Sequence, residues 1–331
     1  MYIMLVPYRN LTVIICVSIL GVVAAVAFKV AEKHPRSQPV LQVISEYQRQ
    51  PLELDEKFFL HDLVDPDAGK TPLLISPSVQ PQPQRQVPSD GITALAYVAG
   101  DLKSGTIYLE RNSRVALPVA SMSKLVTAFV ATETLDLGDI IVIGSDDIDV
   151  PPDQSRIKVD EKFTVTELLD ALLLSSSNVA AEAFASYIDR SAFLELMSGY
   201  AWEIGMPTSF FADPSGVSPR NKASAVDLFA LARYLYGSRP DILGLTRTSE
   251  VRLPTTTDHE ARIFTSTHPL VSDQGFLGGK TGRTPQAGDT MLTVMEISGH
   301  PVGIIVLGSA YDVRAIDTKL LVERVRKMIG N

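Results

Sequence analysis

Ser121 and Lys124 are the residues of this chain whose types and spacing best suit a chemical reaction. Side chains three residues apart share one face of a helix, and the apolar run Leu125–Ala131 that follows is typical of a buried helix. A lysine held beside a serine can accept the hydroxyl proton, so a serine nucleophile needs no histidine. The pair therefore predicts a lysine-activated serine at the start of a helix.

Two further polar motifs follow in chain order. Ser176–Asn178 ends a helical run at 166–174, and Lys280–Gly282 precedes the strand-like Thr290–Ile297. Ser176 and Asn178 lie two residues apart in a predicted loop, so a hydroxyl and an amide can point at the same site.

Two other segments repeat parts of this pattern. Ser155–Lys158 has the serine–lysine spacing, but it follows Pro151–Asp153 and alternates apolar and polar residues like an exposed strand. Lys103–Gly105 lies between the apolar runs Ala94–Ala99 and Thr106–Leu109, as a hairpin turn does. Neither has a helix that could direct a lysine at a serine, so we exclude both from the site.

The three motifs together resemble those of the penicillin-binding protein and serine β-lactamase superfamily. Within it, Pro118–Leu125 and Gly278–Gly282 are similar to segments of the low-molecular-weight D-alanyl-D-alanine carboxypeptidases. The resemblance covers roughly residues 91–331. It implies a serine hydrolase that acts on peptidoglycan stem peptides through an acyl-enzyme and binds β-lactams, with no metal and no cofactor.

The resemblance also implies catalytic roles. Ser121 attacks the carbonyl of a D-Ala-D-Ala peptide bond, Lys124 accepts its proton, and Ser176 relays a proton to the leaving group. The oxyanion hole is formed by the backbone N–H groups of Ser121 and Arg283. We expect burial and the like charge of Lys280 to lower the pKa of Lys124, because both disfavour the ammonium form.

Substrate-binding roles follow from the same resemblance. Asn178 hydrogen-bonds the substrate amide, and Lys280 and Thr281 bind the terminal carboxylate. Gly282 leaves room for the substrate backbone to lie beside a strand, as glycine does where another backbone approaches closely.

Composition excludes several other kinds of site. The 331 residues carry a net charge of −8, so no basic face for nucleic acid is expected. Cys16 is the single cysteine, which excludes a disulfide within the chain, and the spacing of a zinc site is missing. The five histidines are scattered, without the paired spacing of a metal or catalytic motif.

Residues 1–34 are predicted to be a membrane anchor or a signal segment. Leu11–Phe28 has eighteen residues without a charge, which is longer than a usual signal-peptide core and sufficient for a span. We predict a single-pass anchor in the cytoplasmic membrane, with secretion after cleavage near Ala25–Ala27 as the alternative. Basic residues are more numerous after the segment than before it, which favours a cytoplasmic body. The resemblance to cell-wall enzymes instead favours an extracytoplasmic catalytic domain.

Residues 35–90 are predicted to be a Pro- and Gln-rich linker. They contain nine of the 21 prolines, and such a composition favours an extended, solvated chain over a packed core. Within them, Leu52–Val64 mixes charged and apolar residues. This segment is expected to be either a transient helix or a short helix that docks on the domain or on a partner.

The region 91–331 predicts an α+β fold. Ile92–Ala99 and Thr106–Arg111 form a hairpin near its start, and Thr290–Ile297 and Pro301–Gly308 are consecutive strands near its end. A short strand is expected at Asp139–Gly144, and helices are expected at Thr166–Ser175, Val179–Tyr187, Ala192–Ile204, Ser224–Tyr236 and Val313–Ile329. Strands at both ends predict one antiparallel sheet. The resemblance adds flanking helices and an inserted helical sub-domain, a β-lactamase/transpeptidase-like layout.

Four functions are compatible with these motifs. A D,D-carboxypeptidase is the leading hypothesis. The chain ends soon after Val313–Ile329, so we expect it to lack the C-terminal β domain of many carboxypeptidases, and a D,D-endopeptidase that cuts cross-links is a close alternative. A β-lactamase is disfavoured, because fast deacylation needs a further base that the sequence does not identify. A non-catalytic penicillin-binding sensor or scaffold is disfavoured, because binding alone would not need Lys124.

Overall fold

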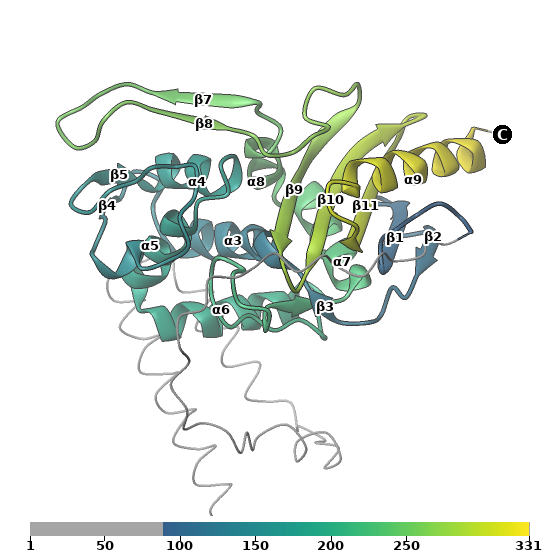
Figure 1. The fold of residues 1–331 in the computed structure, drawn as a ribbon, viewed down its shortest axis with the longest axis horizontal. Coiled ribbons are helices and arrows are strands. Elements are labelled where there is room, and N and C mark those ends of the chain that lie inside the picture. Colours follow the sequence, from purple (N-terminus) through teal and green to yellow (C-terminus); the bar gives the residue numbers. More distant parts are fainter. Residues whose placement is uncertain (1–88, 331) are drawn as a thin grey trace, which may run out of the picture.

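The computed structural model describes residues 89–330, in which a five-stranded antiparallel sheet has the strand order β2-β1-β11-β10-β9. Two strands come from the N-terminal part of this range and three from its end. They are β1 (Ala96–Asp101), β2 (Ile107–Arg111), β9 (Phe276–Thr284), β10 (Gly288–Ile297) and β11 (His300–Ser309). The prediction of one antiparallel sheet built from both ends of the domain is therefore confirmed (Figure 1).

Strand β1 lies inside the sheet because its residues suit burial on both faces. All six of its residues are buried, and it pairs with β2 on one side and β11 on the other. The register with β11 places Ala96 opposite Leu307 and Gly100 opposite Gly303. Strands covered on both faces have near-continuous apolar sequences rather than alternating ones. The predicted turn at Lys103–Gly105 joins β1 to β2.

Helices cover both faces of the sheet. Helix α9 (Arg314–Ile329) packs on β10 and β11 from one side, and α7 (Ala225–Gly237) packs on β1 and β11 from the other (Figure 1). Apolar side chains of α9 such as Leu321 and Val325 are fully buried in the core on that side. The sheet is thus a layer between helices. Its edge strand, β9, lies next to the remaining helices.

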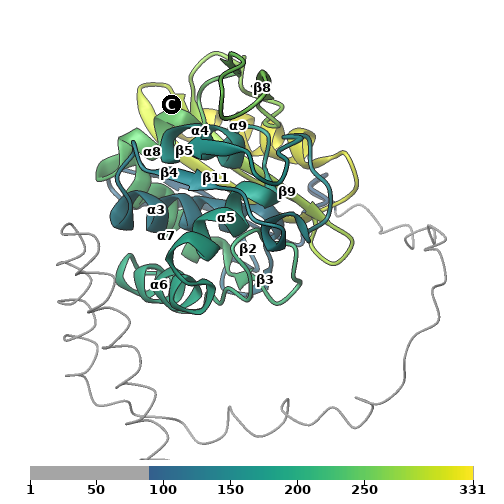
Figure 2. The same cartoon turned by 90° about the vertical axis from the view of Figure 1, so that its left-hand side faces the viewer.

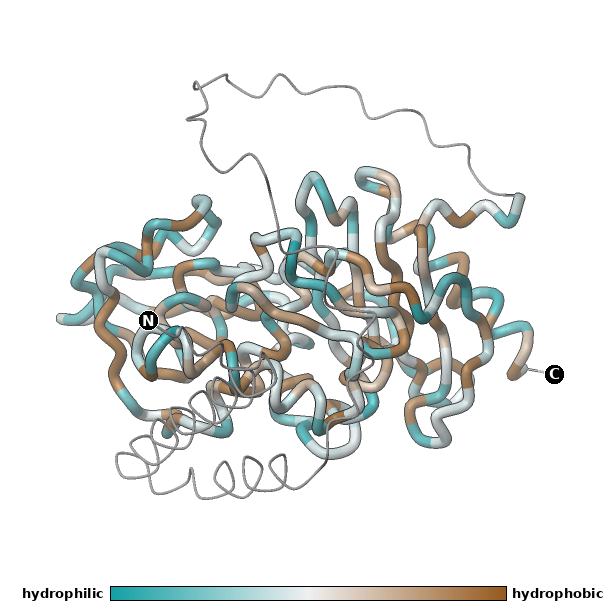
Figure 3. Tube along the Cα trace, turned by 90° about the horizontal axis from the view of Figure 1, so that it is seen from below, coloured by the Kyte–Doolittle hydropathy of each residue, from teal (hydrophilic) through white to brown (hydrophobic). Residues whose placement is uncertain are grey.

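The inserted helical sub-domain contains the helices that follow the first motif. They are α3 (Lys124–Thr134), α4 (Val165–Leu173), α5 (Asn178–Ile188) and α6 (Arg190–Glu203). Helix α3 is buried on every side over its first eight residues, as expected of a helix that is apolar all round. Figure 2 views the molecule from this helical end, and Figure 3 shows apolar segments running through strands and helices while the peripheral loops are polar.

Short elements complete the described range. They are β3 (Leu117–Pro118), β4 (Ile140–Val142), β5 (Lys162–Thr164), β6 (Lys222–Ala223), β7 (Glu250–Leu253), β8 (Arg262–Thr265) and α8 (Pro240–Leu245). The hairpin of β7 and β8 extends over the helical sub-domain, where the Lys162 backbone N–H donates to Asp258 O at 3.0 Å (Figure 1).

The prediction of an exposed strand at the Ser155–Lys158 segment is wrong. Burial does alternate there, since Ser155 and Ile157 are buried while Arg156 and Lys158 are exposed. However, Arg156 has a φ of 56°, in the left-handed region that an extended strand does not use. The segment is an irregular loop, and the alternation reflects its packing against the domain.

The predicted anchor Leu11–Phe28 and the predicted short helix Leu52–Val64 both lie outside the described residues. Among residues 89–330, none of the helices combines the length and the apolar character that crossing a bilayer requires.

Candidate active site

The first motif forms the junction between a short turn and a buried helix. Ser121 lies in the short 3-10 turn η2 (Ala120–Ser123), which leads directly into α3 at Lys124. Lys124 is fully buried, whereas Ser121 is partly exposed. The Nζ atom of Lys124 donates to the Oγ atom of Ser121 at 3.0 Å. The structure therefore presents an accessible hydroxyl in direct contact with a buried amine.

Lys124 has two further oxygen partners. Its Nζ donates to Asn178 Oδ1 at 2.8 Å and to the Ser215 carbonyl oxygen at 2.5 Å. The Ser215 carbonyl, which lies in the turn Asp213–Gly216, is a partner that sequence reasoning missed. The Asp213 carboxylate holds this turn by accepting from the backbone N–H groups of Ser215 and Ser218 at 2.9 and 2.7 Å. Three oxygens therefore fix the amine next to Ser121.

Burial gives Lys124 the acid–base property of a usable base. Desolvation lowers the pKa of Lys124 to about 7, although the negative charges of Asp153, Asp213 and Glu182 act in the opposite direction. Lys280 was expected to lower the pKa of Lys124, but it is not among the causes of that shift. Burial instead lowers the pKa of Lys280, and the charge of Lys124 lowers it further. A large fraction of Lys124 is thus neutral near pH 7.

The second motif begins helix α5 instead of lying wholly in a loop. Ser176 is in the loop, with a φ of 60°, and Ser177 is the N-cap whose Oγ accepts from the Ala180 backbone N–H at 3.1 Å. Asn178 is the first residue of α5, so its prediction as a loop residue is wrong. Serine is a favoured N-cap, because its side chain satisfies a free N–H of the first helical turn.

The third motif lies on the edge strand β9 and reaches the second motif. Lys280 is 1% exposed, and its Nζ donates to Ser176 Oγ at 2.9 Å and to Thr281 O at 3.0 Å. The hydroxyl of Thr281 forms a hydrogen bond of 2.8 Å with that of Thr267, which sequence reasoning had not connected with the site. Lys280 thereby binds the second motif, and it lies close enough to Lys124 for the two charges to repel each other.

Gly282 is required by a close approach between β9 and η2. A Cβ atom at this position would lie 2.9 Å from the Ser121 backbone nitrogen and 2.5 Å from Thr290 Oγ1. The Gly282 carbonyl oxygen accepts from Arg314 Nη1 at 2.8 Å. The glycine therefore lets the strand pack directly against the turn that carries the nucleophile, in addition to its predicted role beside the substrate.

The competing serine–lysine segment does not form a second site. Ser155 is 2% exposed, and its Oγ accepts from Ser177 Oγ at 3.0 Å and donates to Asp153. Lys158 is exposed and forms an ion pair with Glu260 at 2.8 Å, so it does not contact Ser155 through its amine. The turn at Lys103–Gly105 connects β1 to β2, away from the three motifs in sequence and in fold.

Comparisons with known proteins agree with this geometry. The model of the family described as D-alanyl-D-alanine carboxypeptidase matches residues 82–310, which is more than half of the chain. The chain belongs to the D-alanyl-D-alanine carboxypeptidase family.

Relatives and solved structures support the assignment. The chain is 27% identical over 239 residues to a D-alanyl-D-alanine endopeptidase of Pseudomonas aeruginosa, covering 70% of this chain and 76% of the relative. It is 28% identical over 230 residues to a D-alanyl-D-alanine carboxypeptidase of Mycobacterium tuberculosis, covering 68% and 78%. Penicillin-binding protein D2 of Listeria monocytogenes in its cefotaxime-bound form has a similar structure, with a TM-score of 0.62, 29% identity, and coverage of 70% of this chain and 96% of that one.

In this member of the D-alanyl-D-alanine carboxypeptidase family, the residue after the third motif has an engaged side chain. The Arg283 guanidinium is held by the carboxylates of Asp289 and Asp312 and lies 4.1 Å from the ring centroid of Tyr311. These ion pairs raise the pKa of Arg283. The guanidinium is thus occupied by the neighbouring strand β10 and by the loop that follows β11, and the predicted oxyanion role concerns only the backbone N–H.

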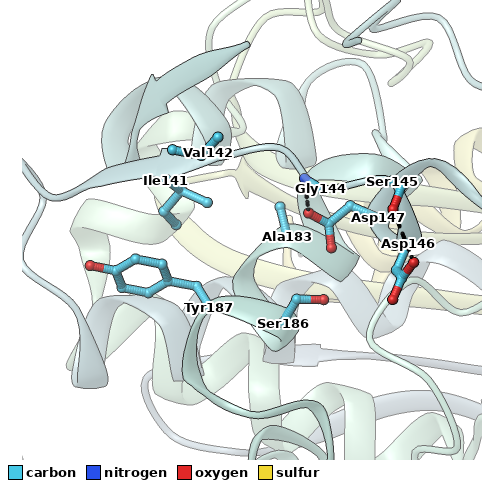
Figure 4. Close-up of a pocket in the computed structure, with 9 residues that line it drawn as sticks. All are labelled: Ile141, Val142, Gly144, Ser145, Asp146, Asp147, Ala183, Ser186 and Tyr187. Atoms are coloured by element: carbon cyan, nitrogen blue, oxygen red, sulfur yellow. Dashed lines mark hydrogen bonds between the residues drawn. The ribbon is translucent and has the colours of Figure 1, made fainter. Parts of the chain in front are cut away.

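A separate pocket of about 280 Å³ lies between β4, the turn η3 (Asp146–Ile148) and α5. Figure 4 shows Tyr187 and Ser186 of α5 on one side and the loop at Gly144 on the other, where the Asp147 carboxylate accepts from the Gly144 N–H at 2.8 Å. None of the motif residues of this family member lines the pocket. It therefore does not contain the reacting groups.

Proposed function

We propose that the chain is a serine-type D-alanyl-D-alanine carboxypeptidase, which removes the terminal D-Ala from peptidoglycan stem peptides through an acyl-enzyme. The observation that carries the proposal is the 3.0 Å contact between Ser121 Oγ and Lys124 Nζ, because burial brings the pKa of that lysine to about 7. Membership of the family supports the substrate class.

The acylation step follows from this pair. Neutral Lys124 accepts the Ser121 proton while Oγ attacks the carbonyl carbon of the D-Ala-D-Ala bond. The backbone N–H groups of Ser121 and Arg283 stabilise the oxyanion, a kind of contact whose loss costs roughly 100- to 1,000-fold in turnover. The C–N bond then breaks, and an acyl-enzyme forms on Ser121.

The leaving amine must receive a proton in the same step. Lys280 Nζ donates to Ser176 Oγ at 2.9 Å, so the hydroxyl proton of Ser176 is free to be donated elsewhere. This arrangement suits Ser176 as the relay to the departing D-Ala. Ser176 recovers a proton from the Lys124 ammonium, which leaves that amine neutral again. Water then attacks the carbonyl carbon of the acyl-enzyme and gives a proton to Lys124, which passes it to Ser121 Oγ as the ester bond breaks.

Three residues are assigned to substrate binding. Lys280 and Thr281 bind the terminal carboxylate, and Asn178 hydrogen-bonds the substrate amide near the reacting bond. The lowered pKa of Lys280 in the free protein means that an incoming carboxylate would favour protonation of this amine, since an opposite charge stabilises the ammonium form. Carboxylate recognition and proton uptake are therefore coupled at Lys280.

A D,D-endopeptidase that cleaves cross-links is the second candidate, because similar proteins carry that name. The two activities differ in the group that leaves when the bond is cut: the terminal D-Ala for the carboxypeptidase, and a cross-linked stem peptide for the endopeptidase. The deciding experiment is incubation of the full chain with monomeric and dimeric muropeptides, followed by mass analysis. Release of free D-Ala from the monomer supports the carboxypeptidase, whereas conversion of dimer to monomer without free D-Ala supports the endopeptidase.

Lys280→Ala is expected to weaken capture of peptide and penicillin alike. A charge-assisted hydrogen bond is worth about 1.5–3 kcal/mol, so second-order acylation should fall roughly 10- to 150-fold if that energy is lost in the transition state. A peptide amidated at its C-terminus should show a much smaller loss, because the charge partner is already absent. Lys103→Ala is the matched control, since it changes the other Lys-Ser-Gly-like motif. Equal losses for the free acid and the amide would contradict the carboxylate assignment.

Gly282→Ala is expected to slow acylation of Ser121 by up to about 100-fold, because misplacement of a reacting group by about 1 Å costs that much. The added methyl group would lie 2.9 Å from the Ser121 backbone nitrogen, so η2 and β9 must move apart. The measurement is the rate of labelling by a fluorescent penicillin. Gly199→Ala on α6 is the control, because a Cβ atom there meets no other atom within 4 Å. A wild-type rate for Gly282→Ala would show that the contact is not needed.

We propose further that the protein is anchored in the cytoplasmic membrane with its catalytic domain outside. The support is the uncharged length of Leu11–Phe28 and the extracytoplasmic location of peptidoglycan. A periplasmically active reporter fused after Asn331 should be active, and the protein should fractionate with membranes. A reporter active only in the cytoplasm would contradict the orientation, and a mature N-terminus at Phe28 would contradict the anchor.

A further inference from the structure

A segment outside the three motifs crosses the start of helix α5. Between η3 and β5, the chain passes over Ser177 and Asn178 at residues 151–155. The Asn178 Nδ2 group donates to the Pro151 carbonyl oxygen at 3.0 Å. Ser155, in the same segment, is in contact with Ser177 at 3.0 Å. The segment therefore packs on the second motif through polar contacts.

Asp153 makes most of these contacts. Its Oδ2 atom accepts from the Asn178 backbone N–H at 2.6 Å, from the Val179 N–H at 3.3 Å and from Ser177 Oγ at 3.1 Å. Its Oδ1 atom accepts from the Ser155 backbone N–H at 2.8 Å and from the Ser155 hydroxyl. One carboxylate thus joins its own loop to the first turn of α5, where free N–H groups and the helix dipole favour a negative charge.

The consequence for the site lies in the Asn178 side chain. The carbonyl end of its amide accepts from Lys124 Nζ at 2.8 Å, and the NH₂ end donates to the loop that Asp153 holds. We propose that Asp153 is a positioning residue for acyl transfer, because its carboxylate fixes the backbone of Asn178 and so holds that amide against the amine of Lys124. This inference rests on the proposed function of Ser121 and Lys124.

The charge of Asp153 has a second effect that can be separated from its contacts. Charged groups face Lys124 from each neighbouring segment: Asp153 from the 151–155 loop, Glu182 from α5, Asp213 from the 213–218 turn and Lys280 from β9. Among the carboxylates that raise the pKa of Lys124, Asp153 has the largest effect. Removing this charge should lower the pKa of Lys124 further. In a plot of acylation rate against pH, the acid limb should therefore move to lower pH.

A merely structural role would have a different outcome. If Asp153 only capped α5, its loss would loosen the helix start and admit water to Lys124, which would raise the pKa of the amine. The chain offers a matched helix cap away from Lys124. Asp189 caps α6, where its Oδ1 atom accepts from the Ala192 backbone N–H at 3.0 Å. Asp189→Asn therefore controls for the loss of a carboxylate cap as such.

The experiment compares Asp153→Asn, Asp153→Glu and Asp189→Asn with the wild-type full chain. Second-order acylation by a fluorescent penicillin is measured from pH 5 to 10, and folding is checked by circular dichroism and thermal unfolding. Asp153→Asn should acylate up to about 100-fold more slowly at its own optimum, because Asn178 is misplaced, and its acid limb should shift to lower pH. Asp153→Glu keeps the charge but alters the contacts. It should therefore acylate more slowly than the wild type, with the acid limb of its pH profile at the wild-type position. Asp189→Asn should have the wild-type acylation rate and the wild-type acid limb.

Three results would overturn the inference. Asp153→Asn could acylate at the wild-type rate, its acid limb could move to higher pH, or Asp189→Asn could lose as much activity as Asp153→Asn. If Asp153→Asn does not fold, Asp153→Glu decides alone, because an unchanged rate in that variant would show that the contacts are not needed. Absence of labelling in the wild-type protein would instead overturn the proposed function, and this inference with it.

Discussion

Ser121→Ala is expected to abolish covalent labelling by penicillin and to reduce peptide hydrolysis by at least about 10⁴-fold, the scale on which loss of a serine nucleophile acts in other hydrolases. The Ser121 hydroxyl is partly exposed and touches the amine of Lys124, and the alanine variant removes only the atom that would carry the acyl group. The fold should survive, because the hydrogen bond to Oγ comes from Lys124 in the next turn of the chain, whereas η2 approaches β9 through its backbone. Intact-mass measurement after penicillin treatment provides the test.

The second serine–lysine spacing supplies the control. Ser155 is buried and engaged with Asp153 and Ser177, so Ser155→Ala should still form an adduct on Ser121. Peptide mapping locates the adduct in both proteins. An adduct on Ser155, or full labelling of Ser121→Ala, would show that the nucleophile has been misassigned.

Much of the site could be predicted because its chemistry is encoded locally. Ser121 and Lys124 meet through the geometry of one helical turn, which spacing alone specifies. The helix expected at Val179–Tyr187 likewise follows from its local pattern and is found as α5. The junction of the second and third motifs, where Lys280 meets Ser176 across 104 residues, came only from the resemblance to a known family.

The supporting groups could not be predicted, because they act through main-chain atoms or distant segments. The Ser215 carbonyl lies 91 residues from Lys124, and any residue type supplies such an oxygen. Asp153 comes just before Ser155–Lys158, a segment that resembles a strand by its alternation although the positive φ of Arg156 shows that it is a loop. Residue patterns do not report where such a loop folds back.

Strand β9 shows a further limit of hydrophobic patterning. It contains three glycines, Gly278, Gly279 and Gly282, which lower strand propensity, so the alternation of apolar residues does not indicate it. The structure shows why they are there: each would place a Cβ atom within 3.0 Å of a neighbouring segment. The feature that hides the strand from pattern analysis is the one that lets it pack against η2 and α8.

Lys124→Arg is expected to remove acylation almost completely, by about 10⁴-fold or more, although the positive charge is kept. A guanidinium stays protonated at any pH the protein tolerates, so it cannot accept the Ser121 proton. The wild-type rate should rise with pH through about 7, because the pKa of Lys124 is lowered to that value and the neutral amine is the active form. The measurement is second-order penicillin acylation from pH 5 to 10.

Lys124→Met separates a failed base from a failed fold, because an unbranched apolar chain can occupy the buried volume of the lysine. It should be as inactive as Lys124→Arg but well folded. The folded-state pKa of Lys124 lies below its ordinary value of 10.5, so the unfolded chain binds more protons between pH 7 and 10.5. Wild-type stability should therefore rise relative to Lys124→Met across that window, by at most about 1.4 kcal/mol per pH unit. A stability difference that does not change with pH, together with acylation of either variant at the wild-type rate, would rule out a buried, neutral lysine as the base.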